Sequence, residues 1–349
     1  MKTLPLTRSM HLLPIASILH EAGESVASLL QQSRLPSDCL DNRQSLIPSE
    51  SAFRFRALAA QTLGISDVTL QATQYLEIAD LGDFGKALLR APTLLSLLTR
   101  FRDLANTQTT MAAIHLTPKK SGGVSFCHHF QHGPASGLWE SDLYVLQWTI
   151  KVVRLVDPTW SPEEIWSMSP AAPGRERTLE KLGATVASFH RDCTGFVVPA
   201  EMFALPLAEA MATEDGAIAE ADPSHMSSLA QSYSDSLAEV IRTYSSDRWL
   251  TIEEVAEVLG ISTRSLQRRL SEEGTTFTDA LERTRAELAG ELLEKTDMMI
   301  AEIAIRLGYR DRGNFTRAFR RWSGVSPRVY RQQRGLDAQQ LCPLTNAEP

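Results

Sequence analysis

Apolar residues in the C-terminal part of the chain recur with the spacing of short amphipathic helices, and the whole pattern occurs twice. Each copy has apolar residues at i, i+3, i+4 and i+7, then a glycine, then a second amphipathic helix. The first copy consists of Ile252, Val255, Ala256, Leu259, Gly260, Leu266 and Leu270. The second, offset by 48 residues in its first helix and by 49 in its second, consists of Ile300, Ile303, Ala304, Leu307, Gly308, Phe315 and Phe319. This repeat predicts two helix-turn-helix units.

Capping residues stand at the predicted helix ends. Thr251 with Glu254 has the spacing of a capping box at the start of the first copy. Asp311 is a good N-cap for the second helix of the second copy. Gly260 and Gly308 stand where the chain must leave a helix, which predicts a positive φ at both.

A further helix is predicted between the two copies, because its apolar residues have helical spacing. These residues are Leu281, Leu288, Ala289, Leu292 and Leu293. The helix would tie the two units together. Trp322 could stack on a base, but we favour core packing at the end of the last helix.

The rest of the chain mixes helical and strand-like patterns. Helices are predicted at 15–30, 51–63, 94–104 and 142–155, and strands at 111–116, 124–130, 185–190 and 194–198. The resulting fold class is an α+β N-terminal domain followed by an all-α domain with two helix-turn-helix subdomains joined by a helix. The predicted domain bounds are 1–208 for the first domain, 209–228 for a linker, 229–334 for the all-α domain and 335–349 for a flexible tail.

Charge is distributed unevenly along a chain whose formal net charge is −7. From 247 to 333, fifteen Arg and Lys accompany fourteen Asp and Glu, and from 300 to 334 nine arginines face only Glu302 and Asp311. A local basic field on an acidic protein is what a surface that contacts phosphates needs.

The polar faces of the two second helices carry side chains suited to reading DNA. Arg pairs bidentately with guanine, and Gln or Asn with adenine, in the major groove. The candidates for base contact are Arg264, Gln267, Arg268, Arg312, Asn314, Thr316 and Arg317. Arg269, Arg320 and Arg321 lie beside them and suit phosphate contacts, which position a protein without reading sequence. The alternative for each is a solvated charged face.

The same segments resemble a known family. "ISTRSLQRRLSEEGTTF" (261–277) and "AEIAIRLGYRDRGNFTRAFRRWSGVSPRVYR" (301–331) are similar to the AraC/XylS family of bacterial transcription regulators. The resemblance implies recognition helices in successive major-groove segments of duplex DNA, with the base-contact candidates at or next to the contacting positions. More weakly, "TGFVVPAEMFALPL" (194–207) resembles an arabinose-binding-type N-terminal domain, which implies small-molecule sensing or dimerisation but identifies no ligand.

Two positions depart from that family's pattern. Gly313 stands near the start of the second recognition helix, where Gly costs about 1 kcal/mol, so we expect this end to be mobile without DNA. Met299 stands where a capping Ser is common, so we expect Asp297 to cap the helix instead.

The four cysteines, Cys39, Cys127, Cys193 and Cys342, are far apart and include no CxxC pair. We expect free thiols in a reducing cytoplasm. The run Cys127-His128-His129 with His132 is the only cluster that suggests a metal. On a strand, however, Cys127 and His129 share one face and His128 points to the other, so no metal site is predicted.

Catalysis has little support. His190, Asp192 and Cys193 suggest a Cys-His pair, but no family signature surrounds them. No GxGxxG, P-loop or HExxH motif is present, so no catalytic residue and no cofactor is predicted. The chain shows neither a signal peptide nor an 18-residue apolar run, which predicts a cytoplasmic protein without a membrane partner.

The sequence therefore predicts a transcription regulator that binds double-stranded DNA as a homodimer, with a small-molecule effector or dimerisation controlling it. RNA polymerase is a further expected partner, and the expected role is that of an activator, although no residue separates activation from repression. Two rivals stay open: control by a protein partner without a small molecule, and a DNA-repair enzyme that the repeat targets to DNA.

Overall fold

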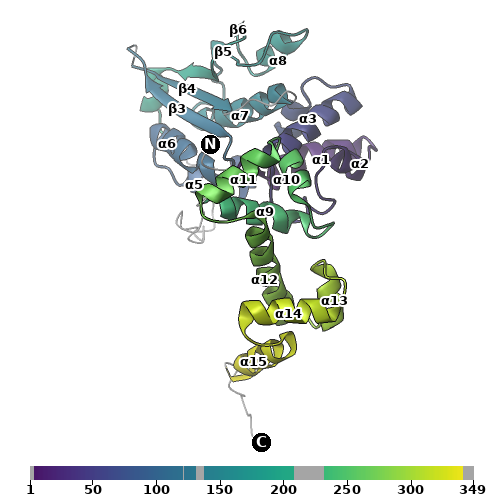
Figure 1. The fold of residues 1–349 in the computed structure, drawn as a ribbon. Coiled ribbons are helices and arrows are strands. Elements are labelled where there is room, and N and C mark those ends of the chain that lie inside the picture. Colours follow the sequence, from purple (N-terminus) through teal and green to yellow (C-terminus); the bar gives the residue numbers. More distant parts are fainter. Residues whose placement is uncertain (1–3, 121, 131–136, 208–231, 341–349) are drawn as a thin grey trace, which may run out of the picture. The chain divides into compact units, whose positions relative to one another are not determined.

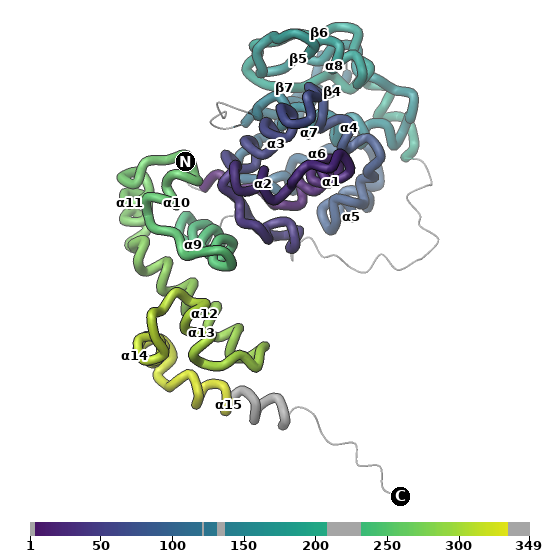
Figure 2. The backbone as a smooth tube through the Cα atoms, turned by 90° about the vertical axis from the view of Figure 1, so that its right-hand side faces the viewer, coloured from purple at the N-terminus to yellow at the C-terminus, as the bar shows by residue number. Residues whose placement is uncertain are grey.

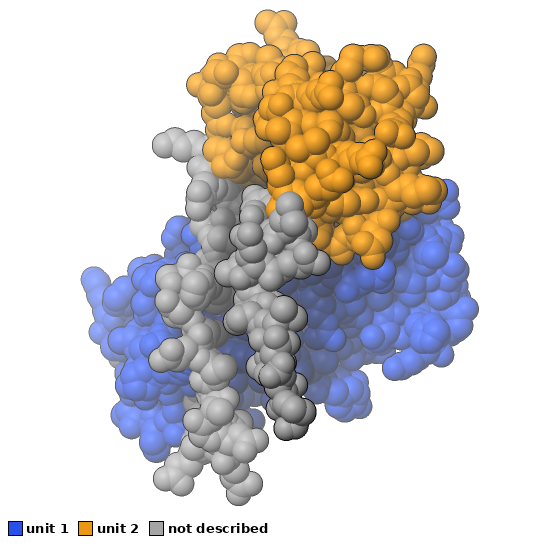
Figure 3. Space-filling model, turned by 90° about the horizontal axis from the view of Figure 1, so that it is seen from below, with its two compact units in different colours: residues 1–231 blue, residues 232–349 orange. Residues whose placement is uncertain are grey.

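The computed structural model describes residues 4–120, 122–130, 137–207 and 232–340. The chain divides into two compact units, Met1–Gln231 (unit 1) and Ser232–Pro349 (unit 2), which are coloured separately in Figure 3. The predicted linker at 209–228 lies outside the described residues, as do positions 341–349 of the predicted tail.

A five-stranded sheet organises unit 1. Its strand order is β3 (Ala112–Pro118), β4 (Val124–Phe130), β7 (Thr194–Val198), β5 (Glu164–Trp166) and β6 (Val186–Ser188), and only the β5–β6 pair is parallel (Figure 1). The four strands predicted in this region are confirmed. The short strand β5 was not predicted, because a three-residue element carries too little pattern. A separate antiparallel pair joins β1 (Leu6–Arg8) to β2 (Leu46–Pro48).

Unit 1 also contains helices. They are α1 (Leu13–Glu21), α2 (Val26–Gln32), α3 (Ser49–Leu63), α4 (Val68–Thr73), α5 (Gly82–Leu89), α6 (Leu94–Leu104), α7 (Leu138–Val153) and α8 (Arg175–Lys181). The single helix predicted at 15–30 is wrong, because the chain turns at Gly23 with φ +79° and restarts at α2. There the hydroxyl of Ser25 accepts a hydrogen bond from the backbone amide of Ser28.

The buried helix α7 packs against the core face of the sheet. Its Leu143, Leu146 and Ile150 join Phe126 and Phe196 in one hydrophobic cluster. Side chains alternate along β4 as predicted: Phe126, His128 and Phe130 are buried, whereas Cys127 and His129 are half-buried.

The core face of the sheet also holds a hydrogen-bonded polar group. The Nε2 atom of His128 lies 3.1 Å from Asp142 Oδ1, and both side chains are fully buried. The other oxygen of Asp142 accepts hydrogen bonds from the hydroxyls of Ser167 and Ser169. His128 therefore has a structural partner on the core side of the sheet, opposite to the Cys127 side.

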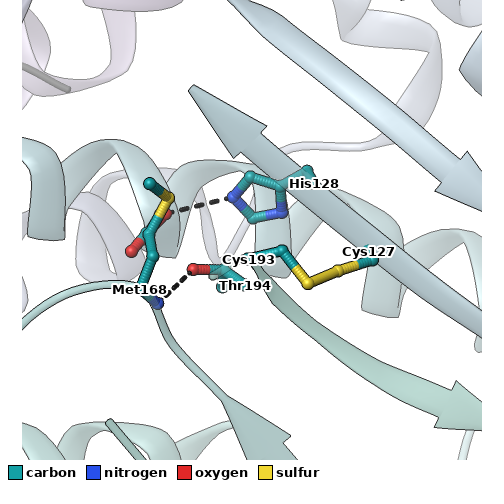
Figure 4. Close-up of a disulfide and its surroundings, with 6 residues drawn as sticks. Cys127, His128, Met168, Cys193 and Thr194 are labelled. Atoms are coloured by element: carbon teal, nitrogen blue, oxygen red, sulfur yellow. Dashed lines mark hydrogen bonds and ion pairs between the residues drawn. A yellow bond between two sulfur atoms is a disulfide. The ribbon is translucent and has the colours of Figure 1, made fainter. Parts of the chain in front are cut away.

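The prediction of free thiols is wrong for two of the four cysteines. Cys127 on β4 and Cys193, next to β7, form a disulfide with a Cα–Cα distance of 6.1 Å (Figure 4). The physical reason is the strand pairing, because β4 and β7 are antiparallel neighbours with Cys127 opposite Gly195. Cys39 is buried and is not part of a disulfide, and Cys342 lies outside the described residues.

Unit 2 is entirely helical, as predicted. Its helices are α9 (Tyr233–Tyr244), α10 (Ile252–Val258), α11 (Thr263–Glu272), α12 (Phe277–Lys295), α13 (Ile300–Arg306), α14 (Arg312–Ser323) and α15 (Pro327–Gln340). The long helix α12 runs from the group α9–α11 to the group α13–α15 (Figure 2). Helix α15 extends through six positions of the predicted tail.

The predicted helix ends in unit 2 are confirmed at most positions. Thr251 and Glu254 form a reciprocal capping box at α10, and Asp311 Oδ1 accepts a hydrogen bond from the amide of Asn314 at 2.7 Å. Gly260 and Gly308 have φ values of +67° and +78°.

The expectation that Asp297 caps α13 is wrong. Met299 is the N-cap residue of this helix, and its backbone amide donates to Glu302 Oε2 at 2.8 Å. The Glu302 carboxylate therefore reaches back to the helix start from one turn into the helix.

Trp322 packs in the core of the second subdomain, as predicted. It joins a cluster that includes Leu293, Ile303 and Phe319, and its ring centre lies 6.4 Å from that of Phe319. The cluster fixes α14 against α12 and α13, so the opposite face of α14 stays available.

Candidate nucleic-acid interface and effector cavity

Helix α11 is the second helix of the first helix-turn-helix unit and separates apolar from polar residues sharply. Leu266 and Leu270 are fully buried. The predicted base-contact residues Arg264, Gln267 and Arg268 are all exposed. Because positions i, i+3 and i+4 lie on one face of a helix, these three side chains form a single polar surface.

Helix α14 repeats this arrangement in the second unit. Phe315, Ala318 and Phe319 are buried against the subdomain core, whereas Arg312 and Arg317 are exposed. Each unit therefore holds its second helix by an apolar face and presents arginines on the other.

The polar side chains of α14 are bonded to one another. Arg317 Nη2 donates to Asn314 Oδ1 at 2.5 Å, and Asn314 Nδ2 donates to Asp311 Oδ2 at 2.7 Å. Thr316 donates its hydroxyl to the carbonyl of Arg312 at 2.8 Å. Gly313 lies within the first turn of the helix. Asp311 thus caps the helix and, through Asn314, orients Arg317.

The three arginines predicted to contact phosphates have different surroundings. Arg269 lies over the ring of Tyr233, with 5.5 Å between its guanidinium carbon and the ring centre. Arg321 Nη2 donates to both carboxylate oxygens of Glu282, at 2.7 and 2.8 Å. Arg320 is exposed and makes no ion pair within the described residues. Of the three, only Arg321 has its charge paired within the described residues, and the charges of Arg269 and Arg320 are not paired there.

A cavity of about 90 Å³ lies in unit 1, between the sheet and the helices. Its walls come from β3 and β4 on one side and from α3, α6 and α7 on the other. The apolar part of the lining includes Phe53, Phe101, Ala112, Ile114 and Phe130.

Polar groups on the same lining are buried with their hydrogen-bonding capacity unfilled. In the described part of the chain, eleven buried side-chain nitrogen or oxygen atoms have no hydrogen-bond partner. Five of them belong to residues that line this cavity: Ser49, Arg56, Gln108, Ser141 and Trp148. Native proteins leave few such atoms unsatisfied, so their concentration around one cavity makes it the candidate ligand site of unit 1.

The sequence alone did not identify these cavity residues, although one signal was present. Ala52, Phe55, Arg56 and Ala59 have the i, i+3, i+4, i+7 spacing of a buried face, and all four are buried in α3. An arginine on an apolar stripe is unusual, because buried Arg normally has a partner.

Two other classes of site lack support in the described ranges. No three His, Cys, Asp or Glu side chains there are grouped to hold a metal ion. His132, which the sequence placed in a candidate cluster, lies outside these ranges, and the sulfur of Cys193 is in the disulfide. None of the helices described is both long and apolar enough to span a bilayer.

Comparison with known families covers most of the chain. Residues 23–207 match the arabinose-binding N-terminal domain of AraC transcription regulators. Residues 255–333 match a helix-turn-helix domain. The two matches coincide with most of unit 1 and with the paired helix-turn-helix units of unit 2.

Individual relatives match over shorter stretches. The ornithine utilization regulator of Pseudomonas aeruginosa is 44% identical over 81 residues, 23% of this chain and 24% of that protein. The regulator VirS of Mycobacterium tuberculosis is 29% identical over 188 residues, 53% of this chain and 55% of that protein. The chain thus matches from about a quarter to about half the length of these relatives.

Among solved structures, the regulator CdpR of Pseudomonas aeruginosa aligns with 93% of this chain and 98% of its own, at 21% identity and a TM-score of 0.40. The family matches are those of transcription regulators, not of enzymes. The chain belongs to the AraC family of transcription regulators, with an arabinose-binding-type N-terminal domain and a C-terminal helix-turn-helix domain.

Proposed function

We propose that this protein is a sequence-specific regulator that reads duplex DNA with α11 and α14. The observation that carries the proposal is the duplication: two helices, each packed by an apolar face, expose arginines at matching positions. The base contacts would come from Arg264, Gln267 and Arg268 in the first unit and from Arg312, Asn314, Thr316 and Arg317 in the second. The two recognition helices would enter the major groove about 34 Å apart, one turn of DNA.

The proposal is tested by comparing cognate and random duplexes. A cognate site is first selected from random DNA with the full chain. Arg268→Ala or Arg317→Ala should then weaken binding to that site by about 1–3 kcal/mol and relax the base preference there. Equal weakening on random DNA would contradict the assignment of base contacts, because phosphate contacts act on every sequence.

Control by a small molecule is the second part of the proposal. The cavity in unit 1 supports it over control by a protein partner, because a protein-controlled domain needs no internal space lined by unpartnered polar groups. A ligand would act by binding one arrangement of the two DNA-binding units better than the other.

The proposal also covers the location of the protein, its oligomeric state and the direction of its effect on transcription. We propose a cytoplasmic homodimer that contacts RNA polymerase and activates transcription. A reporter gene placed behind the selected site tests the sign of the effect, and light scattering tests the dimer. The DNA-repair rival needs a reactive thiol; among the described residues Cys127 and Cys193 are joined in a disulfide and Cys39 is buried, which counts against it.

A further inference from the structure

Arg56 is a buried cation that makes no ion pair in the part of the chain that the structure describes. Its side chain is 5% exposed and lines the cavity. Its Nη2 atom donates to the carbonyl oxygen of His11 at 3.3 Å, and its guanidinium carbon lies 5.4 Å from the ring centre of Tyr144. Its Nε has no hydrogen-bond partner. Burying a charge is costly unless an opposite charge or further hydrogen bonds compensate it, so this group is incomplete as it stands.

No carboxylate lines the cavity, so Arg56 makes it positive at neutral pH. Burial lowers the pKa of Arg56 to about 10, which leaves the guanidinium protonated. The titratable groups beside it are neutral, because burial lowers the pKa of His11 to about 3 and raises the pKa of Tyr144 to about 12. Glu140 does not line the cavity, but its charge raises the pKa of Arg56. Burial raises the pKa of Glu140 to about 7, and its carboxylate accepts hydrogen bonds from the amide and hydroxyl of Thr69.

The rest of the lining combines unpartnered polar groups with apolar side chains. The hydroxyls of Ser49 and Ser141 are buried without partners and can donate to an anion. Phe84 and Phe101 are among the apolar side chains. The cavity thus offers one cationic position beside hydrocarbon.

From these features we propose that the cavity binds a small monocarboxylate, whose carboxylate contacts Arg56 and whose apolar body lies against the phenylalanines. A guanidinium matches the planar geometry of a carboxylate through two parallel hydrogen bonds. A sulfate or phosphate has no apolar part that could contact the phenylalanines, so it would leave this side of the cavity uncovered. This inference rests on the proposed control by a small molecule and names the chemical class of that molecule.

The volume limits the size of this ligand. The cavity measures about 90 Å³. That is well below the pockets of about 300–1,000 Å³ that hold drug-sized ligands. A carboxylate with a body of a few carbon atoms suits a space of this size.

Calorimetric titration of the full chain tests the proposal with defined probes. Butyrate is compared with butyramide, which has the same shape and no charge, and with inorganic sulfate. We expect butyrate to bind at least about tenfold more tightly than butyramide, as expected for hydrogen bonds to an ionised group. Arg56→Met should weaken butyrate binding by about 10- to 100-fold and abolish this preference.

Two further variants distinguish the effect of the Arg56 charge from the effect of the cavity volume. Arg54→Met removes an arginine from the same helix at a half-buried position that does not line the cavity, so butyrate binding should be unchanged. Ala112→Leu fills the cavity from β3 and should block butyrate and butyramide alike. Melting curves of all variants verify that each is folded.

The outcomes distinguish this inference from the function on which it rests. Equal binding of butyrate and butyramide, or butyrate binding that survives Arg56→Met, would overturn the carboxylate site while leaving an effector cavity. Absence of butyrate binding to the wild-type chain would overturn it too. DNA binding is measured on the same preparations, so a protein that binds butyrate but shows no preferred DNA sequence would contradict the proposed function alone.

Discussion

The two helix-turn-helix units share a backbone plan and differ in how their reading side chains are held. On α11, the side chains of Arg264 and Gln267 make no hydrogen bond or ion pair with any described residue. Arg268 has one long ion pair, with 3.7 Å between its Nε and Glu272 Oε1. On α14, by contrast, Arg317 is bonded to Asn314 and Asn314 to Asp311. The same fold thus presents one unconstrained reading surface and one that is internally bonded.

This difference has energetic consequences for DNA binding. The exposed α11 side chains lose rotamer freedom and hydrogen bonds to water when they contact a base, but Arg264 and Gln267 break no side-chain hydrogen bond within the described part of the protein. Arg317 must exchange an existing hydrogen bond for a new one, so its net gain is smaller. We therefore expect the first unit to contribute more of the sequence preference, and the second unit to contribute an arginine whose direction is set before binding.

The turns of the two units differ as well. A side chain at Gly308, in the second turn, would lie 2.8 Å from Cδ1 of Trp249. Trp249 comes from the segment before α10 and donates its Nε1 hydrogen to the carbonyl of Arg306 at 3.0 Å. The guanidinium of Arg285 lies over both Trp249 and Tyr309. The second turn is therefore also the contact between the two subdomains.

Gly308→Ala should have the largest effect on stability. It places a side chain at a positive φ, which costs about 1–2 kcal/mol, and forces Trp249 to move, so we expect a loss of about 3 kcal/mol in the free energy of unfolding. Gly274→Ala is the matched control, because Gly274 has φ +71° with open space around it. This variant should lose only the part of the free energy of unfolding that comes from the positive φ. Urea denaturation followed by circular dichroism measures both. Equal losses would contradict the packing of the second turn.

Arg264→Ala and Arg317→Ala compare the two reading surfaces directly. We expect Arg264→Ala to weaken binding to the cognate site by about 2 kcal/mol and Arg317→Ala by about 1 kcal/mol, within the range for base-contacting arginines. Fluorescence anisotropy with a labelled duplex measures both affinities. A larger loss for Arg317 would show that pre-orientation outweighs the exchange of hydrogen bonds.

Asp311→Ala and Ser262→Ala compare the caps of the two recognition helices. Ser262 and Asp311 both accept from a helix amide, so each variant should lose about 1 kcal/mol of stability. Only Asp311 also holds Asn314 and, through it, Arg317. Asp311→Ala should therefore alter affinity for cognate DNA more than Ser262→Ala does at a temperature where both variants are folded. Equal changes in affinity would show that Asp311 acts as a cap alone.

The sequence was most informative where a structure depends on local pattern. The bounds of β4, β7 and α6 were predicted to the residue, and the caps at Thr251 and Asp311 were correct, because strands, helices and caps are encoded within a few positions. The break at Gly23 was missed because the apolar period continues across it.

Features that depend on tertiary contact were not predicted. The Cys127–Cys193 disulfide joins positions 66 residues apart and follows from a strand pairing that spacing alone does not give. The cavity is formed by residues from separate elements, so only Arg56 left a trace in the sequence. The same limit applies to the arginines of unit 2, since composition could not show that Arg269 packs on Tyr233 or that Arg321 pairs with Glu282.

The smallest expected effect distinguishes the two neighbouring arginines at the end of α14. Arg320→Ala should reduce the slope of log affinity against log salt by about one, with little change in base preference, because each phosphate contact releases about one counterion. Arg321→Ala should change this slope less, because its charge is already paired with Glu282. The single variant Glu282→Gln removes the carboxylate that pairs with Arg321, so Arg321 can contact a phosphate and the salt slope should become steeper. Identical slopes for wild-type, Arg320→Ala and Arg321→Ala proteins would remove both arginines from the DNA surface and leave phosphate binding to other side chains of unit 2.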